Sequence, residues 1–281
     1  MKLNEGGNVF RSEPEKELLA QRIATPDVDP TIKFLEKVIG FEIDEQDLLG
    51  TTGKKNHPSG KFELNSSGDL DINVDENQIS KQELINRLTA WCKGQGIADQ
   101  DIMNKGRTKQ DGWVHAAGDQ IHFRTPIKGD AGNGFVQTDF MFTLKPDFQR
   151  GAKRGGTDEY GGALRAMLLA SLARGRGYKM SPKFGLVDPN NGDEVVADTW
   201  DKIAVLLLGP GAKEEDTHTV ESMISFIKND PNYDELIAPF EVALEKEGKT
   251  LPEQIETFED KQINRIKELS GLSLNSTRMI C

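Results

Sequence analysis

The chain has 281 residues, enough for one large domain or two small ones. Hydrophobic residues make up only 36% of it, and no apolar run is long enough to cross a bilayer, so the composition excludes a membrane-spanning protein. There are 46 acidic residues against 35 basic ones, and the formal net charge is −11. This charge argues against a protein that coats long duplex DNA, because such binding depends on neutralising many phosphates.

The N-terminus and the cysteine content indicate the compartment. Residues 1–7 lack the apolar region of a signal peptide. The two cysteines, Cys92 and Cys281, do not suggest a disulfide framework, and the four histidines lack zinc-ligand spacing. We therefore expect a cytoplasmic protein.

The first predicted elements are a helix and a glycine turn. The pattern predicts a helix over 30–39, which begins after Asp29 and ends at Gly40. Residues 48–55 then run from two leucines into a Gly-Thr turn followed by two lysines. Glycine lets the backbone approach a phosphate, and a hydroxyl and a lysine can bind one, although an ordinary turn with a solvated basic tip has the same composition. The turn is not a Walker A loop, because Leu48 and Lys55 stand where that motif requires Gly and Ser or Thr.

The next segment, 66–75, alternates acidic and apolar residues as a β-strand does. In a strand Asp69 and Asp71 point to the same face. Two like charges ~4 Å apart repel by ~4 kcal/mol at an effective dielectric of about 20, so such a pair persists mainly where a divalent cation neutralises it. A solvated acidic strand end is the alternative. A calcium-binding EF-hand is excluded, because Val74 and Ser80 replace its Gly and Glu.

Further elements follow in order. A helix over 81–91 carries a capping box at Ser80 and Glu83, and 94–111 is predicted to be irregular. Strands over 120–127 and 134–142 flank a glycine-rich loop. The second strand carries Asp139, which lies either exposed on that strand or beside Asp69 and Asp71 across a sheet.

A basic stretch, 145–154, follows directly and contains Lys145, Arg150, Lys153 and Arg154. It can bind a triphosphate or a nucleic-acid backbone, or it is a solvated linker. An amphipathic helix over 161–173 carries Arg165, which faces either phosphates or solvent. The last third of the chain is acidic, with helical patterns over 220–228, 234–247 and 252–269.

The Gly-Thr turn, the Ser-Gly-Asp-Leu-Asp strand and the later Asp139 strand together resemble the nucleotidyltransferase superfamily of DNA polymerase beta type. The order of elements over 48–210 is similar to the C-terminal part of the family X polymerases. The resemblance implies that Asp69, Asp71 and Asp139 bind two Mg²⁺ (or Mn²⁺) ions. It further implies that Gly50 and Thr51 hold the triphosphate, with Lys54, Ser67 and Arg165 as additional substrate contacts. The separation of Gly50 from Asp69 is longer than is usual in the family, so residues 56–65 form an insertion.

We therefore expect an α+β fold with a palm-like mixed sheet, flanking helices and a helical C-terminal region. The expected divisions are an N-terminal helical segment (1–44), a catalytic core (45–150), a helical and hairpin subdomain (151–210) and an acidic helical extension (211–281). The expected activity is metal-dependent transfer of a nucleoside monophosphate from a triphosphate such as ATP, with release of pyrophosphate.

The acceptor stays open among an RNA or DNA end, a protein hydroxyl and a small molecule, with no membrane partner. No helix-hairpin-helix module is recognisable, which favours transfer of a single nucleotide over templated polymerisation. The alternatives are an inactive binding protein that keeps the fold, and a metal-dependent phosphatase or nuclease.

Overall fold

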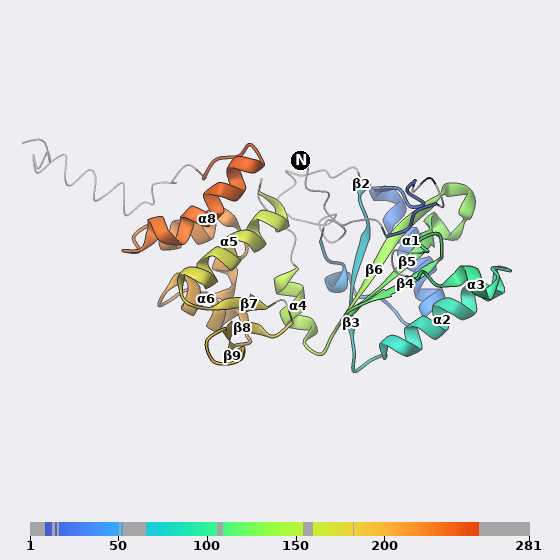
Figure 1. The fold of residues 1–281 in the computed structure, drawn as a ribbon, viewed down its shortest axis with the longest axis horizontal. Helices are drawn as coiled ribbons and strands as arrows, with labels where there is room; N and C mark the ends of the chain where they lie inside the picture. The colour runs from blue at the N-terminus through green and yellow to red at the C-terminus, as the bar shows by residue number, and fades with distance from the viewer. Residues whose placement is uncertain are drawn as a thin grey trace, which may run out of the picture.

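The computed structural model describes residues 9–12, 15, 17–50, 52, 66–105, 109–153, 160–181 and 183–252. They form two lobes that lie side by side, with the short helix α4 (Pro146–Ala152) between them (Figure 1). Within the described residues, no helix is both long enough and apolar enough to cross a bilayer.

The first lobe is built on a four-stranded sheet. Its strand order is β3 (Leu70–Asp75), β6 (Phe135–Thr143), β5 (Gln120–Pro126) and β4 (Val114–Ala117). Strands β3 and β6 are parallel, and the other two pairings are antiparallel. The expected α+β fold with a mixed sheet and flanking helices is therefore confirmed. A separate antiparallel pair, β1 (Ile23–Ala24) and β2 (Ser66–Ser67), leads into β3.

The two faces of the sheet differ in character because successive side chains in a strand point to opposite sides. One face is apolar and packs with α1 (Thr25–Ile39), α2 (Lys81–Gly94) and α3 (Asp99–Ile102) in one hydrophobic cluster. The sheet residues in that cluster are Leu70, Ile72, Val74, Val114, Ile121, Phe123, Val136, Phe140 and Phe142. The other face carries Asp71, Asp139 and His122, so the chemistry-bearing side chains lie opposite the helices.

The ends of helices α1 and α2 match the predicted start and stop signals in part. Helix α1 ends as predicted at Gly40, whose φ is +77°, but it begins at Thr25 and not at residue 30. Proline is tolerated in the first turn of a helix, which fits Pro26 near the start of α1. Pro30 lies inside the helix, where it has no N–H to donate to the preceding turn. In α2 the Ser80 hydroxyl accepts a hydrogen bond from the Glu83 N–H at 3.2 Å, as the capping box predicts.

Short 3₁₀ helices connect the longer elements of the first lobe. They are η1 (Glu45–Asp47), η3 (Ile127–Gly129) and η4 (Ala131–Asn133). The last two lie in the loop between β5 and β6. Helix α3 lies within the segment 94–111 that was predicted to be irregular, and it buries Ile102.

The second lobe has its own core. Helix α5 (Gly161–Gly175) packs against α8 (Tyr233–Lys246), and the core also includes α6 (Trp200–Leu208) and α7 (Val220–Ile227). A three-stranded antiparallel sheet of β7 (Lys179–Ser181), β8 (Gly185–Asp188) and β9 (Glu194–Ala197) adjoins it, and η5 (Glu214–Thr217) precedes α7. The predicted helix over 252–269 lies almost entirely outside the described residues.

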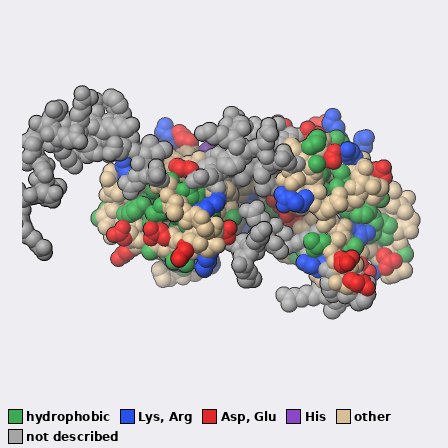
Figure 2. All heavy atoms as spheres, turned by 90° about the horizontal axis from the view of Figure 1, so that it is seen from above, with side chains coloured by type: hydrophobic (Ala, Val, Ile, Leu, Met, Phe, Trp, Pro, Cys, Tyr) green, Lys and Arg blue, Asp and Glu red, His purple; other side chains and the backbone are tan. Residues whose placement is uncertain are grey.

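The two hydrophobic clusters divide the chain at the α4 region. One cluster joins α1 to the sheet, so residues 23–142 share a core, and the other joins residues 148–244. The sequence-based boundaries were placed at 44, 150 and 210. On the face that Figure 2 presents, Lys and Arg side chains are interspersed with Asp and Glu side chains over both lobes.

Candidate metal centre

A row of four titratable side chains crosses the polar face of the sheet. Strand register pairs Asp71 with Asp139, Asp139 with His122, and His122 with His115. Directly paired residues on one face of a sheet have Cβ atoms about 4.5–5.5 Å apart. The fold therefore brings together one residue from each strand, although Asp71 and Asp139 are distant in the sequence.

Asp69 completes an acidic cluster beside this row. Asp69, Asp71 and Asp139 each offer one carboxylate oxygen, and these three oxygens lie within 4.8 Å of one another. Asp139 is only 6% exposed, so it is not the exposed strand residue that was one alternative. Three converging carboxylates form the all-oxygen donor set that hard divalent cations such as Mg²⁺ and Mn²⁺ take. The residues present therefore fit a metal site.

The pKa of Asp71 reflects the crowding of negative charge in this cluster. Burial, together with the negative charges of Asp69 and Asp139, raises the pKa of Asp71 to about 7, and the positive charge of Lys153 opposes the shift. Desolvation and like charges both disfavour the ionised carboxylate. A divalent cation would remove this penalty, because it supplies the positive charge that the cluster lacks.

His122 holds Asp139 in place. Its Nδ1 lies 2.7 Å from Asp139 Oδ1, and the His122 side chain is buried. A carboxylate accepts hydrogen bonds, so the tautomer of His122 that carries its proton on Nδ1 can donate to Asp139. The His115 ring stacks on His122, with centroids 5.6 Å apart and 21° between the planes. Burial, together with the neighbouring His122 and Lys81 side chains, lowers the pKa of His115, which favours its neutral form.

The glycine turn expected to hold phosphate lies against the acidic cluster. Leu49 donates its N–H to the Asp71 carbonyl at 2.9 Å, which aligns the turn with β3. Gly50 has a φ of +56°, and a Cβ on it would lie 2.4 Å from Asp71 Oδ2. Only glycine allows the backbone to approach the carboxylate so closely. Thr51 and Lys54, the other predicted contacts from this turn, lie outside the described residues.

Two hydroxyls shape the backbone at Asp69. Ser67 donates from Oγ to the Asp69 carbonyl at 2.7 Å, and Thr52 donates from Oγ1 to the same carbonyl at 3.1 Å. The predicted contact residue Ser67 thus lies beside the cluster and is 4% exposed. Its described bond orients the turn that carries Asp69.

Arg165 lies elsewhere than expected. Its side chain is neither solvated nor turned to the carboxylates but 1% exposed, in the interior of the second lobe. It donates from Nε to the Thr217 carbonyl at 2.7 Å and from Nη1 to the Gly151 carbonyl at 2.9 Å. A buried guanidinium bonded to two carbonyls holds segments together, so the structure gives Arg165 a structural role.

His122 and Arg150 are the residues near this site that sequence reasoning did not select. Strand periodicity puts His122 on one face with Gln120 and Arg124, yet only the pairing of β5 with β6 shows that this face is the one that carries Asp139. In the sequence, Arg150 is distinguished only as a member of the basic stretch 145–154. Its ion pair with Asp47 of η1 depends on the tertiary fold, because the two residues are far apart in the sequence.

Comparison with known proteins adds no assignment. No protein-family model matches the chain, and no curated protein is similar enough in sequence to count as a relative. The geometry of the acidic cluster therefore carries the functional argument.

Proposed function

We propose that this protein is a metal-dependent nucleotidyltransferase that moves a nucleoside monophosphate from a nucleoside triphosphate to an acceptor hydroxyl. The observation that carries the proposal is the convergence of Asp69, Asp71 and Asp139 on one face of a mixed sheet, with their oxygens within 4.8 Å. The glycine turn against Asp71 supports it, because it provides backbone close to the cluster where phosphates would lie. The resemblance to the polymerase beta superfamily rests on the same residues.

Some residues of the site would bind the cations, and others position those ligands and the phosphates. Asp69, Asp71 and Asp139 would hold the divalent cations, and His122 would fix the Asp139 carboxylate in place. Two such cations, when bound, favour ionisation of the attacking hydroxyl and neutralise the charge of the triphosphate and of the departing pyrophosphate. Gly50 lets the backbone lie close to the phosphates. The hydrogen bonds from the Ser67 and Thr52 hydroxyls to the Asp69 carbonyl hold Asp69 beside Asp71.

The test is pyrophosphate release from each of the four ribo- and four deoxyribonucleoside triphosphates, with Mg²⁺ or Mn²⁺ and total cellular RNA as acceptor. We expect release by the natural chain and none by Asp71→Asn or Asp139→Asn. Asp75→Asn is the matched control, because Asp75 lies on the same strand outside the cluster and accepts its hydrogen bonds from Asn77. Full activity in either cluster variant would rule out the assignment of the three carboxylates.

The products separate the proposal from its alternatives. Labelled nucleotide joined to RNA, to protein or to a small molecule identifies the acceptor. Release of inorganic phosphate alone indicates a phosphatase. Triphosphate binding that depends on Asp71 without turnover indicates a binding protein that keeps the fold.

A further inference from the structure

Lys153, directly after helix α4, lies at the edge of the acidic cluster. Its carbonyl accepts a hydrogen bond from the Gly50 N–H at 3.3 Å, so its backbone adjoins the glycine turn. The positive charge of Lys153 acts on Asp71 and opposes the rise in its pKa. Among the described residues, the Lys153 ammonium makes no hydrogen bond and no ion pair. Lys145, in the same basic stretch, is by contrast paired with Asp198 at 3.0 Å.

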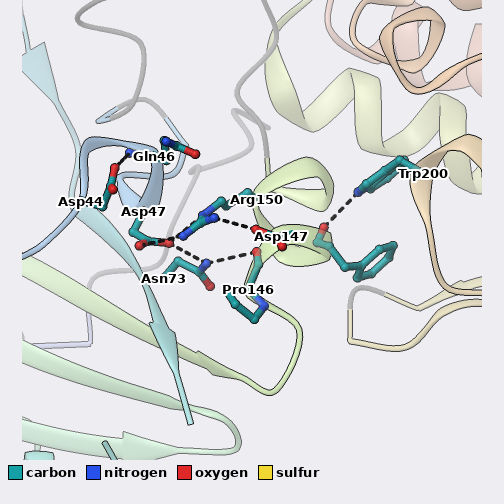
Figure 3. A network of polar contacts seen from close by, with 9 residues as sticks. Asp44, Gln46, Asp47, Asn73, Pro146, Asp147, Arg150 and Trp200 are labelled. Carbon is teal, nitrogen blue, oxygen red and sulfur yellow. Dashed lines mark hydrogen bonds and ion pairs between the residues drawn. The ribbon is translucent and has the colours of Figure 1, made fainter. Parts of the chain in front are cut away.

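Arg150 clamps α4 to the first lobe (Figure 3). It donates from Nε to Asp47 Oδ1 at 2.9 Å and from Nη2 to Asp47 Oδ2 at 3.1 Å, which is a bidentate pair. Asp47 Oδ1 also accepts from Asn73 Nδ2 at 2.8 Å, and Asn73 lies two residues after Asp71 on β3. The same amide donates to the Pro146 carbonyl at the start of α4, at 3.2 Å. The clamp therefore joins the segments that lead to Gly50, Asp71 and Lys153.

The second lobe grips α4 from the other side. Trp200 donates from Nε1 to the Phe148 carbonyl at 3.0 Å, and the two rings stack with centroids 5.2 Å apart (Figure 3). A Cβ at Gly151 would lie 2.0 Å from Trp200 Nε1, so the helix backbone is in direct contact with the indole. Because both lobes hold α4, the position of Lys153 at its end is restrained.

We propose that Lys153 binds a phosphate group of the nucleotide and that Arg150 positions it for this role. The proposal rests on the proposed function, and it adds a substrate-binding residue and a positioning residue to that site. Three carboxylates and two divalent cations leave one net positive charge, whereas a triphosphate carries several negative charges. A lysine at the rim, close to the glycine turn and not engaged by a described carboxylate, supplies the missing positive charge.

The experiment measures binding and not turnover. The probe is α,β-methylene-ATP with Mg²⁺, titrated into the natural chain, Lys153→Gln, Lys153→Arg and the control Lys145→Gln. We expect Lys153→Gln to weaken binding about tenfold to a hundredfold, as loss of a hydrogen bond to a charged group does. Lys153→Arg should keep most of the affinity, and Lys145→Gln should match the natural chain. Lys153→Gln removes no described side-chain hydrogen bond or ion pair, so we expect the variant to stay folded, with only a small change in melting temperature from the lost attraction to Asp71.

The positioning role of Arg150 is tested by a double-mutant cycle. Arg150→Gln should weaken binding of the probe in the natural chain but add little in the Lys153→Gln background, because it acts through Lys153. If Arg150→Gln does not fold, Asp47→Asn weakens the same clamp and takes its place in the cycle. An equal loss of affinity in both backgrounds would overturn the positioning role.

Failure of this inference is distinguishable from failure of the proposed function. If the natural chain binds the probe in an Asp71-dependent manner and Lys153→Gln binds it equally well, Lys153 is not a phosphate ligand while the metal site stands. If the natural chain does not bind the probe with Mg²⁺ or with Mn²⁺, the proposed function and this inference both fail.

Discussion

At the scale of single residues, Asp71 links the pH of the solution to the stability of the fold. Its pKa of about 7 lies above the ordinary value of 3.8, because of burial and the charges of Asp69 and Asp139, with Lys153 opposing the rise. Between these two values the native chain binds more protons at this position than the unfolded chain does. The contribution of Asp71 to the free energy of unfolding is therefore full below pH ~4 and is lost as pH rises through about 7.

This linkage predicts a pH-dependent effect of magnesium. At pH 8 Asp71 is ionised and repelled by its neighbours, so Mg²⁺ should raise the melting temperature. At pH 5 the carboxyl is protonated and the increase should be much smaller. Thermal melting with and without Mg²⁺ at the two pH values checks this. Asp71→Asn is the control: it should melt higher than the natural chain without metal at pH 8 and should gain little from Mg²⁺. An equal effect of Mg²⁺ at both pH values would contradict the prediction.

Gly50 is the second residue whose identity the site requires. Alanine there would be strained by the positive φ, and its Cβ would lie 2.4 Å from Asp71 Oδ2, so Asp71 would have to move. A displacement of about 1 Å in a catalytic group can cost about a hundredfold in rate. We expect Gly50→Ala to lose pyrophosphate release by about that factor.

The control for Gly50→Ala is a glycine that also has a positive φ but has free space around its Cα. Gly96 also has a positive φ, +77°, and a Cβ there would meet nothing within 4 Å. Gly96→Ala should cost stability without loss of activity. Equal activity of Gly50→Ala and the natural chain would mean that the turn lies differently when substrate is bound.

His122 should act on metal affinity through Asp139. Removing the hydrogen bond at 2.7 Å frees the Asp139 carboxylate to rotate, and loss of a hydrogen-bond partner of a metal ligand typically weakens metal binding about 10–100-fold. We expect His122→Phe to weaken Mn²⁺ binding, measured by electron paramagnetic resonance, by that factor. His122→Asn, which retains a donor, should recover part of it. If both variants bind Mn²⁺ like the natural chain, His122 only fills space.

At the scale of elements, helix α4 determines how the second lobe meets the site. Its Gly151 lies against Trp200 with no space for a side chain. Gly151→Ala should therefore force the helix and the indole apart, and we expect a destabilisation of about 1–3 kcal/mol, as overpacking costs. Chemical denaturation measures it. Gly94→Ala, in α2 with open space around it, is the matched control and should be neutral or slightly stabilising.

The sequence predicted correctly those elements that depend on patterns of neighbouring residues. Strands β5 and β6 and the cap of α2 match the expected ranges closely, because period-two alternation and a capping box are properties of neighbouring residues. The predicted start of α1 at residue 30 is wrong, because the helix begins at Thr25 and Pro30 lies inside it. The short helix α3 was missed, since four residues carry too little periodicity to detect.

At the scale of the whole molecule, exposed ion pairs join the two lobes in addition to the contacts of α4. Lys183 of the second lobe lies 3.1 Å from Asp119, in the turn between β4 and β5, and Lys145 lies 3.0 Å from Asp198. Exposed pairs of this kind contribute about 0–1 kcal/mol. Lys183→Ala should accordingly change the free energy of unfolding by less than about 1 kcal/mol. A larger loss in urea denaturation would show that the pair contributes substantially to joining the lobes.

The amino-acid sequence by itself predicted most of the local elements and indicated a cluster of carboxylates that could bind a cation. Alternation around Asp69 and Asp71 predicted one strand with both carboxylates on one face, and like-charge repulsion then indicated a cation. The predicted continuous strand is wrong at Asp69, which lies in a bend between β2 and β3, whereas Asp71 lies in β3. The pairing of Asp139 with Asp71 stayed one of two alternatives, because neither periodicity nor spacing states which strands are neighbours. The mixed sheet followed from the order of elements and from the resemblance to a known superfamily.

Only the tertiary structure decided which side chains share the site. The parallel pairing of β3 with β6 brought Asp139 beside Asp71, and the antiparallel pairing of β5 brought His122 to Asp139. Burial of Arg165 and the contact of Arg150 with Asp47 likewise depend on segments far apart in the chain. The physical reason is that strand register and burial minimise the free energy of the whole packed chain, whereas a sequence pattern records only the preferences of near neighbours.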